Sequence, residues 1–199
     1  SILTGRYNWR SPLKQGVLFG YDRHLIEEGR MTVASLLKKV GYRTACVGKW
    51  HLGMDWAKTG DKPEDVDYSK PIKNGPTEYG FDYFYGISAS LDMPPYVYIE
   101  NNKATQIPDR VTESTLPKAW WRKGPTAPDF KHEEVLPRLT EKALSVIDEY
   151  SDSPFFLYFP LPAPHTPVLP TKEFQGKSGT NAYGDFVLMC DDVVGQIMK

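Results

Sequence analysis

The first regular pattern of apolar and polar residues lies in residues 32–40, TVASLLKKV. Its apolar positions recur every three or four residues, which is the spacing of one face of a helix. Thr32 is a residue type that caps helix N-termini, and Gly41 is the type that ends helices in a left-handed conformation. The β-prone run of residues 42–47 follows at once. A helix, a tight turn and a strand in this order predict an α/β fold.

The middle of the chain shows weaker patterns. Residues 81–87, FDYFYGI, are aromatic enough for a strand or for a packed loop. Residues 91–131 contain many prolines and few periodic apolar positions, which predicts a long connection of the kind that forms binding loops or lids. Trp120 and Trp121 are adjacent there. They could stack on a sugar or an aryl group, but we favour packing against their own scaffold, because buried aromatic rings dominate core energetics.

The last third of the chain has three clear patterns. Residues 132–150 predict an amphipathic helix, with Pro137 in its first turn where proline is tolerated. Residues 155–159, FFLYF, form a continuous apolar run that is typical of a strand buried on both faces. Residues 181–199 predict a closing helix. No internal repeat or domain boundary interrupts these elements.

Composition narrows the functional classes. The chain has 199 residues, of which 40% are hydrophobic and 25% are charged, and its net charge is -1. This is a globular profile without the basic patch that nucleic acids or membrane surfaces require, and no apolar run is long enough to span a membrane. We therefore expect neither a nucleic-acid nor a membrane partner. Cys46 and Cys190 lie in apolar segments, and the sequence leaves open whether they are free or form a disulfide.

Two chemically competent segments follow predicted strands. VGKWH comes after the strand of residues 42–47, and PLPAPHTP comes after the strand of residues 155–159. In open α/β sheets, ligands bind at the carboxyl ends of the strands. The sequence therefore predicts a functional site where these two segments meet.

Lys49, His51 and His165 are the candidate site residues. In an extended chain Lys49 and His51 project to the same side, and a fixed cation beside an imidazole suits an anionic ester. The alternative is a surface lysine with a structural histidine. His165 lies between Pro164 and Pro167, which restrict the backbone and favour rigid presentation of a general acid, although a structural histidine would satisfy the same pattern.

Several other polar residues do not join these clusters. Asp191 and Asp192 are adjacent on a predicted helix and do not face each other, so we do not assign them to a metal. We expect His24 and His132 to make structural or solvent contacts, and Lys172 to be solvated.

Three segments resemble the sulfatases. GYRTACVGKWHLG is similar to the second signature of that family, Gly-Tyr-x-Thr-x-x-x-Gly-Lys-x-His, and SILTGR resembles the end of the first, with Arg6 in a supporting role. FFLYFPLPAPHTP is similar to the segment that carries the second catalytic histidine of the family. These matches occur in the expected order over nearly the whole chain.

The resemblance implies an alkaline-phosphatase-like α/β/α sandwich with a mostly parallel central sheet. Residues 1–199 would be the central part of the N-terminal catalytic domain, incomplete at both ends. The implied reaction is hydrolysis of an O-sulfate ester, of a small molecule or a glycan, to an alcohol and sulfate. By position, Lys49 would bind the sulfate and the nucleophile, His51 would take a proton from the nucleophile, and His165 would act at the leaving oxygen.

The resemblance also implies components outside this chain. The nucleophile would be a formylglycine, made from Cys or Ser by a formylglycine-generating enzyme, about six positions before Ser1. The Ca²⁺ ligands would also lie elsewhere, so we assign no metal ligand here and expect these residues alone to be inactive. A periplasmic or secreted location is implied.

Two alternative functions remain open at this stage. One is a phosphoric or phosphonic ester hydrolase of the same superfamily. The other is a noncatalytic protein that binds sulfated glycans through an aromatic platform, consisting of Pro94, Pro95, Tyr96, Trp120 and Trp121.

Overall fold

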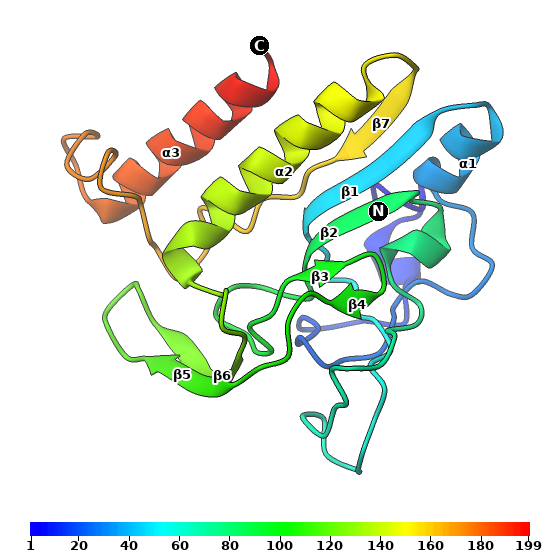
Figure 1. The fold of residues 1–199 in the computed structure, drawn as a ribbon, viewed down its shortest axis with the longest axis horizontal. Helices are drawn as coiled ribbons and strands as arrows, with labels where there is room; N and C mark the ends of the chain where they lie inside the picture. The colour runs from blue at the N-terminus through cyan, green and yellow to red at the C-terminus, as the bar shows by residue number, and fades with distance from the viewer.

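The computed structural model describes residues 1–199, which form a five-stranded sheet, a two-stranded sheet and three α-helices (Figure 1). The α-helices are α1 (Val33–Lys39), α2 (Val135–Tyr150) and α3 (Ala182–Ile197), and the strands are β1 (Arg43–Lys49), β2 (Tyr83–Ile87), β3 (Ile99–Glu100), β4 (Lys103–Ala104), β5 (Arg110–Ser114), β6 (Trp121–Thr126) and β7 (Phe155–Tyr158). Short 3₁₀ helices are η1 (Asn8–Arg10), η2 (Pro76–Tyr79) and η3 (His132–Glu134).

The main sheet is mixed, with strand order β4-β3-β2-β1-β7. The strand β1 is parallel to both of its neighbours, β2 and β7, whereas β3 and β4 extend the sheet in antiparallel orientation. Because β1, β2 and β7 run in the same direction, their carboxyl ends meet at one edge of the sheet. This edge positions the segments after Lys49, Ile87 and Tyr158.

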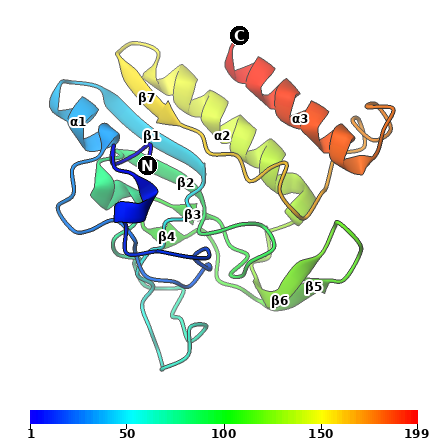
Figure 2. The same ribbon diagram turned by 180° about the vertical axis from the view of Figure 1, so that it is seen from behind.

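Helices and coil cover the two faces of this sheet. The helix α2 packs against β1, β2 and β7, and α3 lies beside α2. The N-terminal segment lies on the opposite face, behind the sheet in Figure 1 and in front of it in Figure 2. A core cluster of 27 buried residues fills the space around β1 and β2, and a cluster of five joins α2 to α3. None of the helices is both long enough and apolar enough to cross a membrane.

The structure confirms the predicted helix–turn–strand unit. The Thr32 side chain accepts a hydrogen bond from the Ser35 N–H, and the Ser35 side chain accepts one from the Thr32 N–H, so that α1 begins with a capping box. Gly41 follows the helix with φ of 90°. The next strand, β1, runs to Lys49, two residues further than its β-prone run predicted.

Residues 81–87 resolve to the strand β2, and residues 132–150 form η3 followed by α2, with Pro137 in the first turn of α2 as predicted. The closing helix is confirmed as α3, capped by Asn181. The prediction for residues 155–159 was wrong in one respect. All residues of β7 are only half-buried, because β7 pairs with β1 alone and forms one edge of this sheet.

The prediction of a long connection over residues 91–131 was wrong. The segment contains β3, β4 and the hairpin of β5 and β6, and Tyr96, Val97 and Tyr98 in it are fully buried. Prolines hide the pattern: Pro125 lies in β6, and its carbonyl accepts a hydrogen bond from the Tyr96 N–H. The strands β3 to β6 are also only two to six residues long, so no sustained alternation of apolar and polar positions reveals them.

The two tryptophans differ in burial, and the five-residue aromatic platform is not formed, because Tyr96 is buried and Trp121 packs inward. Trp121 packs inward, with its ring stacked on that of His132 at a centroid distance of 3.9 Å. Trp120 is 38% exposed and lies under the Arg122 guanidinium. Both Cys46 and Cys190 are free, so the chain has no disulfide.

Candidate active site at the carboxyl ends of β1, β2 and β7

The backbone brings three strand ends together by direct hydrogen bonds. The Lys49 N–H donates to the Pro160 carbonyl at 2.8 Å, which joins the end of β1 to the loop after β7. The Trp50 N–H donates to the Ile87 carbonyl at 3.0 Å, and the His51 N–H donates to the Ser88 carbonyl at 2.9 Å. The residues after all three strands therefore form one continuous surface.

Gly48 makes this close approach possible. Its φ is 137°, a backbone conformation that L side chains rarely adopt, and a methyl group on its Cα would overlap the Pro160 carbonyl. Its register partner on β2 is Gly86, where a methyl group would overlap the Gly48 carbonyl oxygen. Two facing glycines thus allow three strand ends to crowd together just before Lys49.

Lys49 and His51 line the same cavity, of about 490 Å³, together with Arg6 and Tyr158. The extended geometry expected for Lys49 to His51 is wrong, since β1 ends at Lys49 and His51 has φ of 54°. The two side chains nevertheless reach a common space. The left-handed turn at His51 therefore replaces strand alternation as the reason for their proximity.

The His51 ring has a defined hydrogen-bonding partner. Its Nε2 lies 2.8 Å from the Leu18 carbonyl, so Nε2 carries the proton and donates it to that oxygen. Burial lowers the pKa of His51, and the nearby positive charge of Lys49 lowers it further against the opposing effect of the Leu18 carbonyl. The ring is therefore neutral near pH 7, with Nδ1 available to accept a proton.

Lys49 is half-buried, and its Nζ lies 3.5 Å from the Ser90 hydroxyl. Burial lowers the pKa of Lys49, while the negative charge of Asp92 raises it. This ammonium group points into partly desolvated space, where a charge interacts more strongly with an anion than it does in water.

His165 lies on the exposed loop after β7 and has the opposite arrangement of ring nitrogens. Its Nδ1 is 2.7 Å from the Thr166 carbonyl and 3.8 Å from Oδ1 of Asp92. Both partners accept hydrogen bonds, so Nδ1 carries a proton and Nε2 is the nitrogen left for chemistry. His165 lines a second, open cavity together with Lys118 and Tyr183.

The first cavity and His165 share one electrostatic environment. Lys49, His165 and Asp92 all contribute to the pKa of His51, although burial is the largest cause of its shift. The structure thus places the three predicted residues around one region, with Asp92 among them. Lys49, His51 and His165 form no direct hydrogen bond with one another.

Sequence reasoning missed Asp92, Ser90 and Arg122. Asp92 and Ser90 lie directly after β2, the third parallel strand that ends at this edge, so the rule that singled out VGKWH and PLPAPHTP would have found them. The aromatic pattern of residues 81–87 does not distinguish a strand from a packed loop, so the sequence alone does not locate this strand end. Arg122 belongs to the hairpin, whose position no local pattern predicts.

The remaining candidates lie outside this group. Arg6 lines the first cavity and forms an ion pair with Glu27 through two contacts of 3.0 and 2.9 Å. His24 contacts Asp55 at 2.9 Å, and His132 is buried in the core. Lys172 is exposed. No group of three or more His, Cys, Asp or Glu residues is placed to hold a metal ion. Asp191 and Asp192 therefore belong to no such group.

Comparison with known proteins defines the class. The sulfatase family model matches residues 1–199, and the chain therefore belongs to the sulfatase family. A solved structure whose description concerns the metabolism of multiple glycosaminoglycans by Bacteroides thetaiotaomicron is 30% identical, with a TM-score of 0.83 over 99% of this chain and 47% of that one. This match also confirms the α/β fold of the alkaline-phosphatase-like type. A sulfatase from Pseudoalteromonas, 22% identical with a TM-score of 0.64, supports the fold alone.

Relatives at the sequence level are named for specific sulfatases. The chain is 30% identical over 232 residues to the N-acetylgalactosamine-6-O-sulfatase of Bacteroides thetaiotaomicron, an alignment that covers all of this chain and 44% of that protein. It is 30% identical over 175 residues to the human N-acetylgalactosamine-6-sulfatase, covering 87% of this chain and 30% of that protein. The chain thus spans less than half the length of these relatives.

Proposed function

We propose that the intact protein hydrolyses an O-sulfate ester to an alcohol and inorganic sulfate. The supporting observation is that Lys49, a half-buried ammonium group, lies at the same strand ends as two histidines that leave different ring nitrogens free. His51 offers an unprotonated Nδ1, and His165 offers Nε2 while its Nδ1 is held by acceptors. One base, one acid and one cation are the groups that expulsion of an alcohol from an anionic ester requires.

The residues act on the ester as follows. The Lys49 ammonium binds the non-bridging oxygens of the sulfate and stabilises the charge that develops on them. His51 accepts a proton at Nδ1 from the side of the nucleophile, since its Nε2 is occupied by Leu18. His165 acts as an acid in its imidazolium form, in which Nε2 carries a second proton and donates it to the leaving alcohol oxygen. Two histidines with different hydrogen-bond partners thus separate the roles of base and acid.

Two further components belong to this proposal. A formylglycine, produced from Cys or Ser by a formylglycine-generating enzyme, would supply the nucleophile, and Ca²⁺ would neutralise sulfate charge. No group of three or more His, Cys, Asp or Glu residues in this chain is placed to hold Ca²⁺, and we assign the formylglycine to no residue of this chain. We derive no step through either component.

The proposed substrate is a sulfated glycan that carries a 6-O-sulfated amino sugar. Two relatives at 30% identity are named N-acetylgalactosamine-6-sulfatases, which supports this choice. The exposed Trp120 near the His165 loop provides an aromatic face on which a sugar ring can stack.

The test uses the intact protein, coexpressed with a formylglycine-generating enzyme. Hydrolysis of N-acetylgalactosamine 6-sulfate, 4-nitrophenyl sulfate and 4-nitrophenyl phosphate is measured with and without Ca²⁺. We expect calcium-dependent sulfate release, lowered about 10²- to 10⁴-fold by Lys49→Ala, by His51→Ala and by His165→Ala. Lys172→Ala and His24→Ala are matched controls outside the site, and we expect them to retain activity.

Three outcomes distinguish the alternatives. Preference for the phosphate ester would assign the protein to the phosphoester hydrolases of the superfamily. Absence of turnover in a protein whose nucleophile is verified by mass, together with retained glycan binding, would support the noncatalytic function. Full activity of the Lys49 or His165 variant would refute the residue roles while leaving the reaction itself in place.

A further inference from the structure

Asp92 is a buried carboxylate beside the proposed acid, and the three assigned side chains leave it without a role. Its side chain is 4% exposed, and it follows β2 at the edge where Lys49 and His165 lie. Its Oδ2 forms an ion pair with the Arg122 guanidinium. Its Oδ1 is buried and has no hydrogen-bond partner. A buried carboxylate oxygen without a partner is costly, so its presence at a site requires an explanation.

The unpaired oxygen faces His165. The distance from Oδ1 of Asp92 to Nδ1 of His165 is 3.8 Å, and the same Nδ1 lies 2.7 Å from the Thr166 carbonyl. The imidazole thus presents one edge to a carbonyl and a carboxylate. Its other nitrogen, Nε2, points away from both.

Arg122 holds the carboxylate in place from the other side. Its guanidinium donates to the Asp92 backbone carbonyl at 3.1 Å as well as to the carboxylate, and its own N–H donates to the same carbonyl at 3.2 Å. The Arg122 carbonyl in turn accepts a hydrogen bond from the Tyr96 hydroxyl at 2.6 Å. The guanidinium also lies over the rings of Trp120 and Phe19. These contacts fix Asp92 while leaving Oδ1 free.

The chemistry of such an arrangement is general. A carboxylate behind an imidazole selects the tautomer that carries its proton on the near nitrogen, and it stabilises the imidazolium form. A proton donor for a leaving alcohol needs both effects, because it must be charged before transfer and must present its far nitrogen to the substrate. Arg122 reduces the cost of burying the carboxylate, since it compensates part of the charge.

We propose that Asp92, held by Arg122, is a positioning residue that orients His165 through its Nδ1 side, so that Nε2 faces the leaving alcohol. The proposal deepens the sulfatase function and rests on it. A purely structural alternative is that the Asp92–Arg122 pair only anchors the hairpin of β5 and β6 to the sheet. The two interpretations predict a different dependence of the loss in kcat/KM on the leaving group of the ester.

The kinetic test compares two sulfate esters with different leaving groups. 4-Nitrophenol leaves readily without a proton, whereas a sugar alcohol requires one. We expect Asp92→Asn to lower kcat/KM for N-acetylgalactosamine 6-sulfate about 10- to 100-fold, a range typical of groups that orient a reacting residue, and to affect 4-nitrophenyl sulfate much less. His165→Ala should show the same selectivity, and the double variant should be no worse than His165→Ala alone.

The matched control is Asp129→Asn. Asp129 is also a buried carboxylate paired with an arginine, Arg138 at 3.1 Å, but it lines neither cavity. If Asp92 only supports the fold, Asp92→Asn and Asp129→Asn should lower both substrates equally. Equal losses on both esters, or losses that add to those of His165→Ala, would overturn the proposal.

A second readout is independent of turnover. In protein labelled with ¹⁵N-histidine, the His165 ring signals are assigned by their loss in His165→Ala. We expect Asp92→Asn to move the Nδ1 signal of His165, and Asp129→Asn to leave it unchanged. A wild-type protein without sulfatase activity would refute the proposed function, while an unmoved Nδ1 signal would refute the Asp92–His165 pair.

Discussion

Gly48→Ala tests whether the close packing of β1 against the loop after β7 positions the site. The new methyl carbon would stand 3.0 Å from the Pro160 carbonyl carbon and still closer to its oxygen, where the optimal carbon–carbon separation is roughly 3.5–4.0 Å. The Pro160 carbonyl, or β1 itself, must therefore move by about 0.5–1 Å. The carbonyl that moves is the one that accepts the Lys49 N–H, so the displacement reaches the site directly.

Two terms set the size of the effect on stability. A residue other than glycine at a φ of 137° costs about 1–3 kcal/mol, and the strained hydrogen bond adds about 1 kcal/mol. We therefore expect Gly48→Ala to lower the free energy of unfolding by about 2–4 kcal/mol. A displacement near 1 Å at reacting groups lowers kcat/KM by on the order of 10²-fold.

The control separates backbone strain from steric overlap. Gly41 has a φ of 90° with no atom within 4 Å of an added methyl group, so Gly41→Ala measures the backbone penalty alone, about 1–2 kcal/mol. Both variants of the intact protein are compared by denaturant unfolding and by kcat/KM for 4-nitrophenyl sulfate. If Gly48→Ala lost no more stability or activity than Gly41→Ala, the Gly48–Pro160 contact would have no positioning role.

Two further predictions concern buried groups. Burial lowers the pKa of His132 to about 4, against roughly 6.5 in an unfolded chain. Between these two pH values only the unfolded state binds the proton. The free energy of unfolding therefore falls by up to about 3 kcal/mol as the pH drops from 6.5 to 4. His132→Phe should remove this part of the slope in denaturant unfolding measured at several pH values, and an unchanged slope would contradict the assignment. Burial also raises the pKa of both free thiols, to about 11 for Cys190 and higher for the fully buried Cys46. Iodoacetamide at pH 8, followed by peptide mass analysis, should therefore label both cysteines slowly in the folded protein, and Cys46 more slowly than Cys190. Both should react rapidly after unfolding. Rapid labelling of Cys46 in the folded protein would refute its burial.

Local pattern was sufficient for the helices and for two of the three parallel strands. Helical spacing and a capping residue defined α1, because the capping box involves Thr32 and Ser35, only three residues apart. The amphipathic stripe defined α2 in the same way. The strands β1 and β7 were recognised from short apolar runs. Each of these signals lies within one element, which is why the sequence alone contains it.

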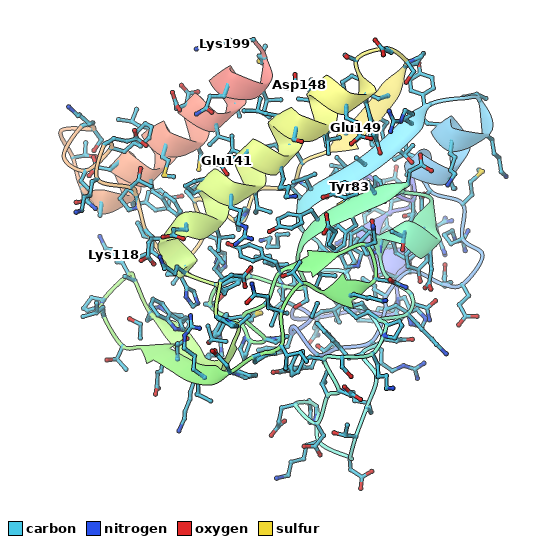
Figure 3. The ribbon with its side chains drawn as sticks, in the orientation of Figure 1. Tyr83, Lys118, Glu141, Asp148, Glu149 and Lys199 are labelled. Atoms are coloured by element: carbon cyan, nitrogen blue, oxygen red, sulfur yellow. The ribbon has the colours of Figure 1, made fainter.

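The strands β3 to β6 were not predictable in this way. They are only two to six residues long, β6 contains Pro125, and the register between β5 and β6 shifts between Thr112 and Ser114. The hairpin of β5 and β6 nevertheless reaches the site. The Val168 N–H donates to the Lys118 carbonyl at 2.7 Å, and Lys118 lies in the segment between β5 and β6 (Figure 3). This hydrogen bond connects the hairpin to the loop of His165.

The sequence by itself determined the family, the fold class and three of the polar residues around the site, because the strand-end motifs at Lys49, His51 and His165 are contiguous. Only the tertiary structure decided which nitrogen each histidine leaves free, since Leu18 and Thr166 supply those acceptors through the folded backbone. It also decided that Asp92 and Arg122 join the group. The physical reason is that hydrogen bonds and buried charges act over a few ångströms of space, whereas sequence patterns record only separation along the chain.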